Sequence, residues 1–196
     1  ALVCPLSSCD YLNYKPQLNT INYIINGEKL YESGQHEEDL LWFCGMEAVK
    51  SRKIANRSRG SKGFDIGGYY VIRSPEGFGM IRCTKFKHRP GHADMLHFDL
   101  WHKGINVLPD IGSYSYNPET KFKEYFRATR NHNTITINGQ NQTKRGPRFM
   151  TIGWTEGFLN AFTFEKDAVY FSGYHTAYEN IHTREIEYKN GRYIIT

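Results

Sequence analysis

Two patterns of apolar and polar positions divide the chain. In the first part, apolar residues of the segment 37–50 recur three to four positions apart, at Leu41, Cys44 and Ala48. This is the spacing of one face of a helix. Three acidic residues open the segment, where the start of a helix favours negative charge. We therefore predict a short helix over residues 37–50.

From Phe64 onward, alternating apolar and polar residues are separated by turn residues, which is typical of strands. Lys103-Gly104 and Asn190-Gly191 predict tight hairpin turns, since Asn-Gly is a strong hairpin signal. Many short strands with regular turns indicate a mainly β fold, an antiparallel multi-stranded β-sandwich with a short N-terminal helical segment. The predicted strands are 69–74, 79–86, 93–101, 105–108 and 133–138, two more within 158–174, then 185–188 and 192–196.

Both ends of the sequence suggest a fragment of a longer protein. The chain stops on the predicted strand 192–196 without a polar tail, and the helical segment near the start has no partner helices to pack on. Between the two parts, the segment 50–62 holds six basic residues and no acidic one. A solvated linker is its ordinary interpretation, and a binding surface is the alternative.

The composition narrows the classes of partner. The net charge is +5 with a sequence pI near 8.9, which favours anionic partners, although solubility alone accounts for such a charge equally well. No stretch approaches the roughly 20 apolar residues that a membrane span needs. The basic segment 50–62 is short and lacks aromatic residues, so we expect no nucleic acid as a partner.

The predicted strand around residues 94–102 has two faces of different character. Alternation places Leu96, Phe98 and Leu100 on one face, which we expect in the core. The opposite face is either a groove suited to a sugar or an ordinary outer surface. Its residues are Met95, His97, Asp99 and Trp101.

Histidines gather in and just after this stretch. Five of the eight fall there, at positions 88, 92, 97, 102 and 132. His92 leads into a predicted strand, Asp110 ends a later one and His132 opens a third, so the three side chains can meet at one rim of a sheet. Histidine and carboxylate are common ligands of a metal ion. Scattered surface histidines are the alternative, because no local pair with metal-ligand spacing is present.

Three blocks resemble a known family. The order of GHADMLHFDLW, PDIGSYSYN and FRATRNHNTITINGQNQ is similar to the central motifs of the heparinase II/III-like family of bacterial polysaccharide lyases, which includes heparin, heparan sulfate and alginate lyases. The similarity is clear over residues 67–149. It implies an (α/α) toroid followed by a β-sandwich, with the substrate in the cleft between them. Residues 1–62 would then be the tail of the helical domain and its linker, and residues 63–196 an incomplete sandwich that packs against the toroid.

The resemblance also implies a metal site and a substrate class. Many members bind zinc through the histidine of the HAD block, the aspartate of the DxG block and the histidine of the HNT block. These correspond here to His92, Asp110 and His132, with zinc or another divalent ion as the cofactor. The implied partner is an acidic polysaccharide such as heparan sulfate or alginate, and the implied location is periplasmic or secreted.

The family's reaction is β-elimination at a uronic acid. A base removes the C5 proton, and an acid, usually a tyrosine, protonates the departing oxygen. Where members commonly have a catalytic histidine before the HAD block, this chain has Pro90, which carries no acid or base. His88 is the candidate replacement, and Tyr116 is a candidate acid, with Tyr114 beside it. Strand packing is the plainer role for either tyrosine.

Arginines flank the proposed site. Arg89, Arg127 and Arg130 are candidates for binding substrate, because a guanidinium group matches carboxylate and sulfate with two donors. A salt bridge is the alternative role for Arg127. The resemblance predicts part of a lyase that cleaves uronate-containing anionic glycans. The alternative is a non-catalytic glycan-binding or exopolysaccharide-assembly protein that keeps the fold and has lost the base.

Overall fold

The chain forms two compact units, Ala1–Ser58 and Arg59–Thr196, which are described separately. The predicted boundary after residue 62 lies four residues beyond this division. Among the described residues, none of the helices combines the length and the apolar character that crossing a membrane requires. The computed structural model describes residues 7–10, 12–54, 59–115, 117–147 and 150–196.

The first unit is helical. Its longest helix, α1 (Lys15–Asn26), has Pro16 in its first turn, where the missing N–H costs no hydrogen bond. It ends at Gly27, whose φ of 72° is the left-handed conformation that glycine adopts without strain. The sequence patterns did not predict α1, although both terminal residues are ordinary helix signals.

The single helix predicted over residues 37–50 is wrong in its continuity. A turn of 3-10 helix, η1 (Gln35–Glu37), leads into α2 (Glu38–Cys44), and a separate short helix, α3 (Met46–Val49), follows. Gly45 separates them with a φ of 81°, which no right-handed helix contains. The apolar periodicity therefore continues across a break that the glycine imposes.

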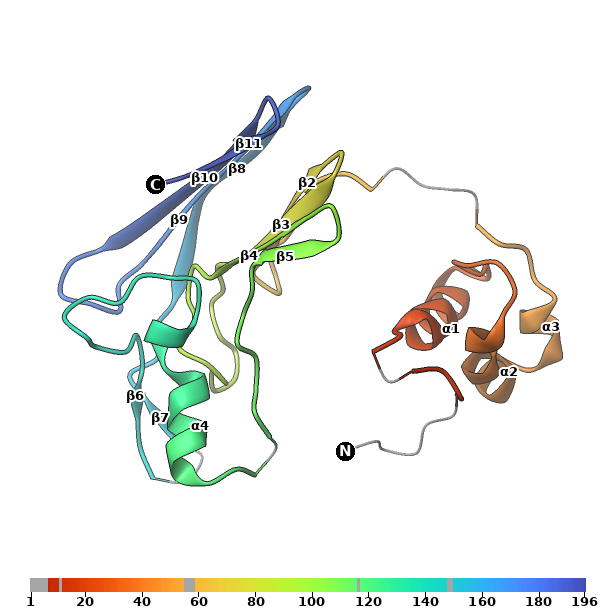
Figure 1. Cartoon of the computed structure of the whole chain (residues 1–196), viewed down its shortest axis with the longest axis horizontal. Coiled ribbons are helices and arrows are strands. Elements are labelled where there is room, and N and C mark those ends of the chain that lie inside the picture. The colour runs from red at the N-terminus through yellow and green to blue at the C-terminus, as the bar shows by residue number, and fades with distance from the viewer. Residues whose placement is uncertain (1–6, 11, 55–58, 116, 148–149) are drawn as a thin grey trace. The chain divides into compact units, whose positions relative to one another are not determined.

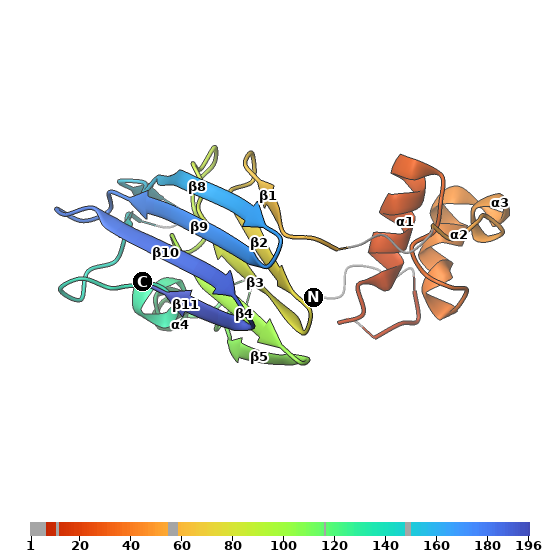
Figure 2. The same ribbon diagram turned by 90° about the horizontal axis from the view of Figure 1, so that it is seen from above.

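The second unit is an antiparallel β-sandwich, as predicted (Figures 1 and 2). One sheet has the strand order β1-β2-β3-β4-β5, and the other has the order β11-β10-β9-β8. A third sheet pairs only β6 and β7. The strands of the first sheet are β1 (Lys62–Phe64), β2 (Tyr69–Ser74), β3 (Gly77–Arg82), β4 (Phe98–His102) and β5 (Ile105–Leu108). The others are β6 (Lys144–Arg145), β7 (Thr151–Ile152), β8 (Gly157–Glu165), β9 (Ala168–His175), β10 (His182–Lys189) and β11 (Arg192–Ile195).

The core lies between the two large sheets. Ile72 and Phe98 of the first sheet and Phe171 and Ile186 of the second are all fully buried and belong to one apolar cluster. Alternation along each strand sends these side chains inward and their neighbours outward. Figure 2 shows the second sheet lying over the first.

Both predicted hairpin turns are confirmed. Lys103-Gly104 joins β4 to β5, with φ values of 50° and 79°, and Asn190-Gly191 joins β10 to β11, with 51° and 77°. Two successive residues with positive φ match the right-handed twist of the flanking strands. The first of these hairpins ends close to Asp110, so its geometry helps to place that carboxylate.

The strand predicted over residues 93–101 begins later than expected. Leu96 has a φ of 59° in a turn that precedes β4, so the alternation holds only from Phe98 onward. Met95 and His97, which were predicted on the outer face, are both buried. The prediction was wrong there because the turn redirects the side chains that a continuous strand would have alternated.

The strand predicted over residues 133–138 is also wrong. The segment forms bends with one isolated bridge between Ile137 and Gln140, around a turn at Asn138-Gly139. Its polar groups bond elsewhere: the Thr134 hydroxyl donates to the backbone oxygen of Met95 at 2.7 Å. Before it stand two elements that were not predicted, α4 (Thr120–Arg127) and η2 (Thr129–Asn131).

We predict that Phe171→Ala lowers the free energy of unfolding of the sandwich by about 3–5 kcal/mol, because it leaves a cavity in the core. Phe164→Ala, in the same sheet, is the matched control, since its side chain is 55% exposed. Urea denaturation of both variants measures the difference. Equal losses would mean that the core does not lie between the two sheets.

Candidate functional site

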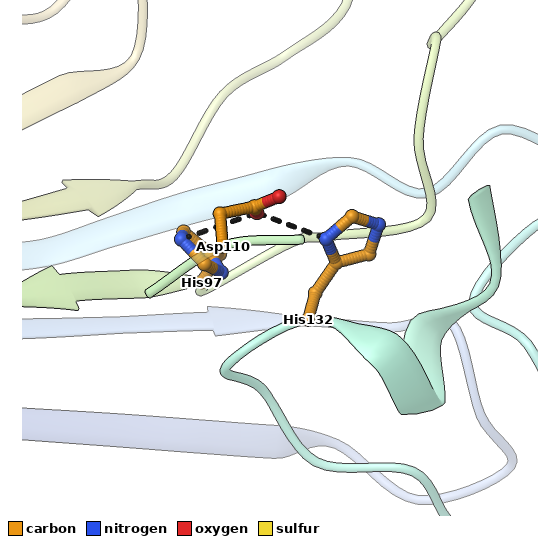
Figure 3. Close-up of side chains that lie close together, drawn as sticks. All are labelled: His97, Asp110 and His132. Atoms are coloured by element: carbon orange, nitrogen blue, oxygen red, sulfur yellow. Dashed lines mark hydrogen bonds and ion pairs between the residues drawn. The ribbon is translucent and has the colours of Figure 1, made fainter. Parts of the chain in front are cut away.

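Three segments bring ionisable side chains together at one end of the sandwich. His97 precedes β4, Asp110 follows β5 and His132 follows η2. Asp110 Oδ2 lies 2.9 Å from His132 Nδ1 and 3.4 Å from His97 Nε2 (Figure 3). Their donor atoms all lie within 4.8 Å of one another, which is close enough for a shared metal ion.

His92 approaches the same group from the other side of His132. Its Nδ1 lies 3.3 Å from His132 Nε2 and 3.1 Å from the backbone oxygen of Phe126, and its Nε2 lies 3.1 Å from Ser113 Oγ. The predicted residues His92, His132 and Asp110 thus form a chain with His132 in the middle. We call these three residues and His97 the His–Asp cluster.

His97 was not among the predicted ligands. Strand alternation had assigned it to an outer face, whereas the turn at Leu96 buries it beside Asp110. The sequence signal for a role of His97 was its place in a histidine-rich stretch, but that signal does not show which of the histidines belong to the site. Only the three-dimensional course of the loops shows which of them meet.

A buried glutamine joins the segments that carry the cluster. The Gln142 side chain accepts a hydrogen bond from the backbone N–H of Met95 at 2.6 Å and donates one to the backbone oxygen of Met95 at 3.1 Å. Its backbone N–H donates to the Thr129 hydroxyl at 2.9 Å. Gln142 therefore ties the turn before His97 to the segment that leads to His132.

Asn133 makes the connection to Asp110. Its backbone N–H donates to His97 Nδ1 at 3.0 Å, and its side-chain amide donates to the backbone oxygens of Leu108 and Pro109 at 2.7 and 3.1 Å. Buried polar groups of this kind are costly unless they are paired, so each bond helps to fix the loops.

Burial and hydrogen bonding set the charges of the cluster. Burial raises the pKa of Asp110, but hydrogen bonds from His132 and from the Gly112 N–H outweigh it and hold the pKa at about 2. Burial lowers the pKa of His92 and of His97. The cluster therefore combines an ionised carboxylate at Asp110 with rings at His92 and His97 that favour the neutral form, and these are the forms of such groups that bind a metal ion.

The hydrogen bonds decide which ring nitrogens are free. His97 Nδ1 accepts a bond from Asn133, so the single proton of its neutral ring is on Nε2, which faces Asp110. His97 is thus a donor to the carboxylate. His132 Nδ1 faces Asp110 as well, so the other ring nitrogen, Nε2, is directed toward His92.

His92 Nδ1 lies 3.1 Å from the backbone oxygen of Phe126, which only accepts, so the proton of the neutral His92 ring is on Nδ1 and its unprotonated nitrogen is Nε2, beside Ser113 Oγ. His92 Nδ1 therefore binds a metal ion only after it gives up the hydrogen bond to Phe126.

A hollow opens beside His92, with about 380 Å³ of empty space that includes open solvent at its mouth. We call it the Tyr114 hollow; it lies between α4 and the loop around Ser113, and Arg127 lines it. Of the other predicted arginines, Arg89 lies with His88 on a neighbouring hollow of about 580 Å³, and Arg130 lies 5.9 Å from the centre of the Tyr125 ring. Tyr116 falls outside the described residues.

Comparisons with known proteins agree on one family. The model of the family described as "Heparinase II/III-like, C-terminal" matches residues 56–196. A heparin-sulfate lyase of Bacteroides stercoris is 35% identical over 91 residues, which cover 41% of this chain and 13% of that protein. A heparin-sulfate lyase of Bacteroides thetaiotaomicron is 27% identical over 148 residues, which cover 67% of this chain and 20% of that protein. The chain thus spans a fifth or less of the length of these curated relatives.

Solved structures share the fold. Heparan sulfate lyase HepC from Pedobacter heparinus superposes with a TM-score of 0.63 at 18% identity, covering 91% of this chain and 26% of that one. A heparinase III structure gives a TM-score of 0.57 at 23% identity, covering 89% of this chain and 28% of that one. At such identities the likeness speaks for the fold alone.

We predict that Gln142→Leu lowers the free energy of unfolding by about 1–3 kcal/mol, because it leaves the backbone N–H of Met95 buried without a partner. Gln140→Leu is the matched control two residues away, since Gln140 is exposed. Chemical denaturation of both variants gives the comparison. If both cost the same, Gln142 does not anchor the turn before His97.

Proposed function

The chain belongs to the heparinase II/III-like family, and we propose that it is part of a lyase that cleaves uronate-containing anionic glycans by β-elimination. In this proposal the sandwich provides a metal site and one wall of the substrate cleft. The remaining parts of the machinery, including the usual toroid, belong to regions of the family's proteins that this chain does not cover. The heparin-sulfate lyases among the relatives make an acidic glycosaminoglycan the proposed substrate class, and a periplasmic or secreted location is proposed with it.

The observation that carries this proposal is that residues of all three family blocks come together around His132. His92, Asp110 and His132 come from separate blocks up to 40 positions apart, yet His132 lies within 3.3 Å of His92 and 2.9 Å of Asp110. A fold retained for packing alone has no need to collect two imidazoles and a carboxylate at a loop-lined rim. Sites of chemistry commonly have this composition.

We propose that the His–Asp cluster binds a divalent ion of the zinc type. His132 is the first nitrogen ligand in this proposal, and His92 is the second once its ring gives up the hydrogen bond to Phe126. Asp110 bonds to the opposite nitrogen of His132 and so orients that ring, an arrangement common around zinc. A bound zinc ion supplies positive charge beside the glycan and ties the three loops together.

The proton-transfer residues of this branch must differ from the usual set. Pro90 stands where members commonly carry a histidine, and a proline side chain transfers no proton. His88, which is exposed on the hollow that adjoins Gly91, is the proposed base, and Tyr116 is the proposed acid. Both assignments rest on the family's reaction and on the position of these residues beside the HAD and DxG blocks.

We predict that His132→Ala and His92→Ala both lose the stoichiometric metal, whereas His97→Ala keeps it, because the proton on His97 Nε2 makes that residue a donor to Asp110. Elemental analysis of the purified, zinc-loaded protein measures the metal content. His102→Ala is the control, since its half-exposed ring faces Glu76. Loss with His97→Ala and retention with His92→Ala would move the ion to the other side of His132. Retention in all three variants would contradict the metal proposal.

We predict that protein carrying this domain releases an unsaturated uronate product from heparan sulfate, alginate or hyaluronan, followed by its ultraviolet absorbance. His88→Ala lowers kcat by roughly 10²–10⁴-fold if it is the base. His102→Ala, equally a histidine on the surface, leaves the rate unchanged. If none of the three glycans yields the product, the catalytic proposal fails.

Pro90 favours a second candidate, a glycan-binding or exopolysaccharide-assembly protein without catalysis. Such a protein retains the sandwich and the cluster while lacking the base. Two results distinguish this candidate from the lyase. Its wild-type form releases no unsaturated product, and its His88→Ala variant binds acidic glycans with wild-type affinity.

A further inference from the structure

The Tyr114 hollow has an aromatic wall that packing alone does not explain. The Tyr114 ring is 58% exposed and lies 5.5 Å from the Phe126 ring at 22°, with Phe122 at 4.9 Å behind it. This stack holds the tyrosine ring in place while leaving part of it open to the hollow that all three aromatic residues line. A fixed, exposed aromatic ring offers an apolar surface with a polar tip. The C–H-bearing face of a pyranose ring has the matching character.

The same hollow contains an unused cationic donor. Arg127 lines it, and the Nη1 atom of Arg127 is buried without a hydrogen-bond partner among the described residues. A buried guanidinium N–H without a partner costs free energy that an acceptor would recover. The acceptor that fits is an anion, since the group is a forked cation.

Further guanidinium groups reinforce this positive charge. Arg145 donates to the backbone oxygen of Gly91 at 2.8 Å, which fixes it next to the residue that precedes His92. Burial is the largest effect that lowers the pKa of Arg127, and the positive charge of Arg89 lowers it further. Burial also lowers the pKa of Arg145, and the positive charge of Arg127 adds to that effect. Arg127 and the cations beside it therefore repel one another, and Glu124 is the charge that raises the pKa of both Arg127 and Arg145. An anion in the hollow would relieve the repulsion.

We propose that the Tyr114 hollow is a subsite for one acidic sugar residue, with the anionic substituent on Arg127 and the pyranose ring against Tyr114. The proposal rests on the proposed glycan substrate and gives it a place, directly beside His92 of the His–Asp cluster. Carboxylate and sulfate share the oxygens that a guanidinium fork binds, so either group satisfies the site.

Binding of defined oligosaccharides tests the subsite without using turnover. Isothermal titration of the protein compares a heparan sulfate oligosaccharide, an unsulfated heparosan oligosaccharide of the same length and its carboxyl-reduced form. We expect Arg127→Gln to weaken binding of the acidic oligosaccharides about tenfold or more. Lys121→Gln removes the same charge from an exposed position of α4 and should change affinity less than twofold. Binding of heparosan but not of its reduced form assigns the anion as carboxylate, and a requirement for sulfation assigns it as sulfate.

Tyrosine variants test the other wall and do not depend on the folding of the arginine variant. Tyr114→Phe keeps the ring and should keep the affinity, whereas Tyr114→Ala should lose it about tenfold. Equal effects of Arg127→Gln and Lys121→Gln, in proteins with unchanged melting temperature, would overturn the proposal, as would full affinity in Tyr114→Ala. If the protein releases unsaturated product but the variants bind oligosaccharides like the wild type, the subsite proposal is wrong and the lyase proposal stands. If the variants weaken binding as expected but no product is released, the subsite proposal stands and the lyase proposal is wrong.

Discussion

The hydrogen bond between Asp110 and His132 is the contact on which the functional end of the sandwich depends. It joins the loop that leaves β5 to the loop that follows α4, two segments that the sheets alone do not hold together. Because Asp110 holds His132 Nδ1, the opposite nitrogen of the ring is turned toward His92. One carboxylate thus contacts both His132 and His97 and orients the ring in the middle of the His–Asp cluster.

Three polar side chains, one buried and two half-buried, hold the loops around this contact. Gln142 fixes the turn before β4, Asn133 fixes the exit from β5, and the Arg184 guanidinium donates to the backbone oxygen of Leu96 at 2.8 Å from the second sheet. All of these groups are hydrogen-bonded to backbone atoms of the loops. The apolar core positions the strands, and these polar side chains fix the loops at the end of the sandwich to the strands. The His–Asp cluster and the Tyr114 hollow lie next to each other at that end. A site built in this way is held by its surroundings before any ligand arrives.

The sequence predicted the parts of the fold that depend on local rules. The strand 69–74, the strand 105–108 and both hairpin turns are confirmed, because alternation and positive-φ turn residues act over a few positions. The turn at Leu96 and the bends of residues 133–138 were missed, since bonds to distant residues such as Gln142 and Met95 override a good strand pattern there. The helices α1 and α4 were missed although the first has clear end signals.

The same distinction applies to the candidate site. Asp110 and His132 were predicted to lie close together, and they do. His97 lies beside Asp110 because of the turn at Leu96, which no local sequence pattern predicts. The Tyr114 hollow escaped prediction because part of its wall comes from α4, an element that the sequence patterns did not predict. Arg127 had been named as a candidate for substrate binding, but its buried and unpaired nitrogen is visible only in three dimensions.

The central claim is that the His–Asp cluster holds a divalent ion at His132 Nε2. It is tested most directly by anomalous X-ray scattering at the zinc edge from crystals of the zinc-loaded protein. We expect one strong peak within about 2.0–2.1 Å of His132 Nε2, on the side that faces His92. Zinc peaks elsewhere on the molecule, with none touching His132, would contradict it.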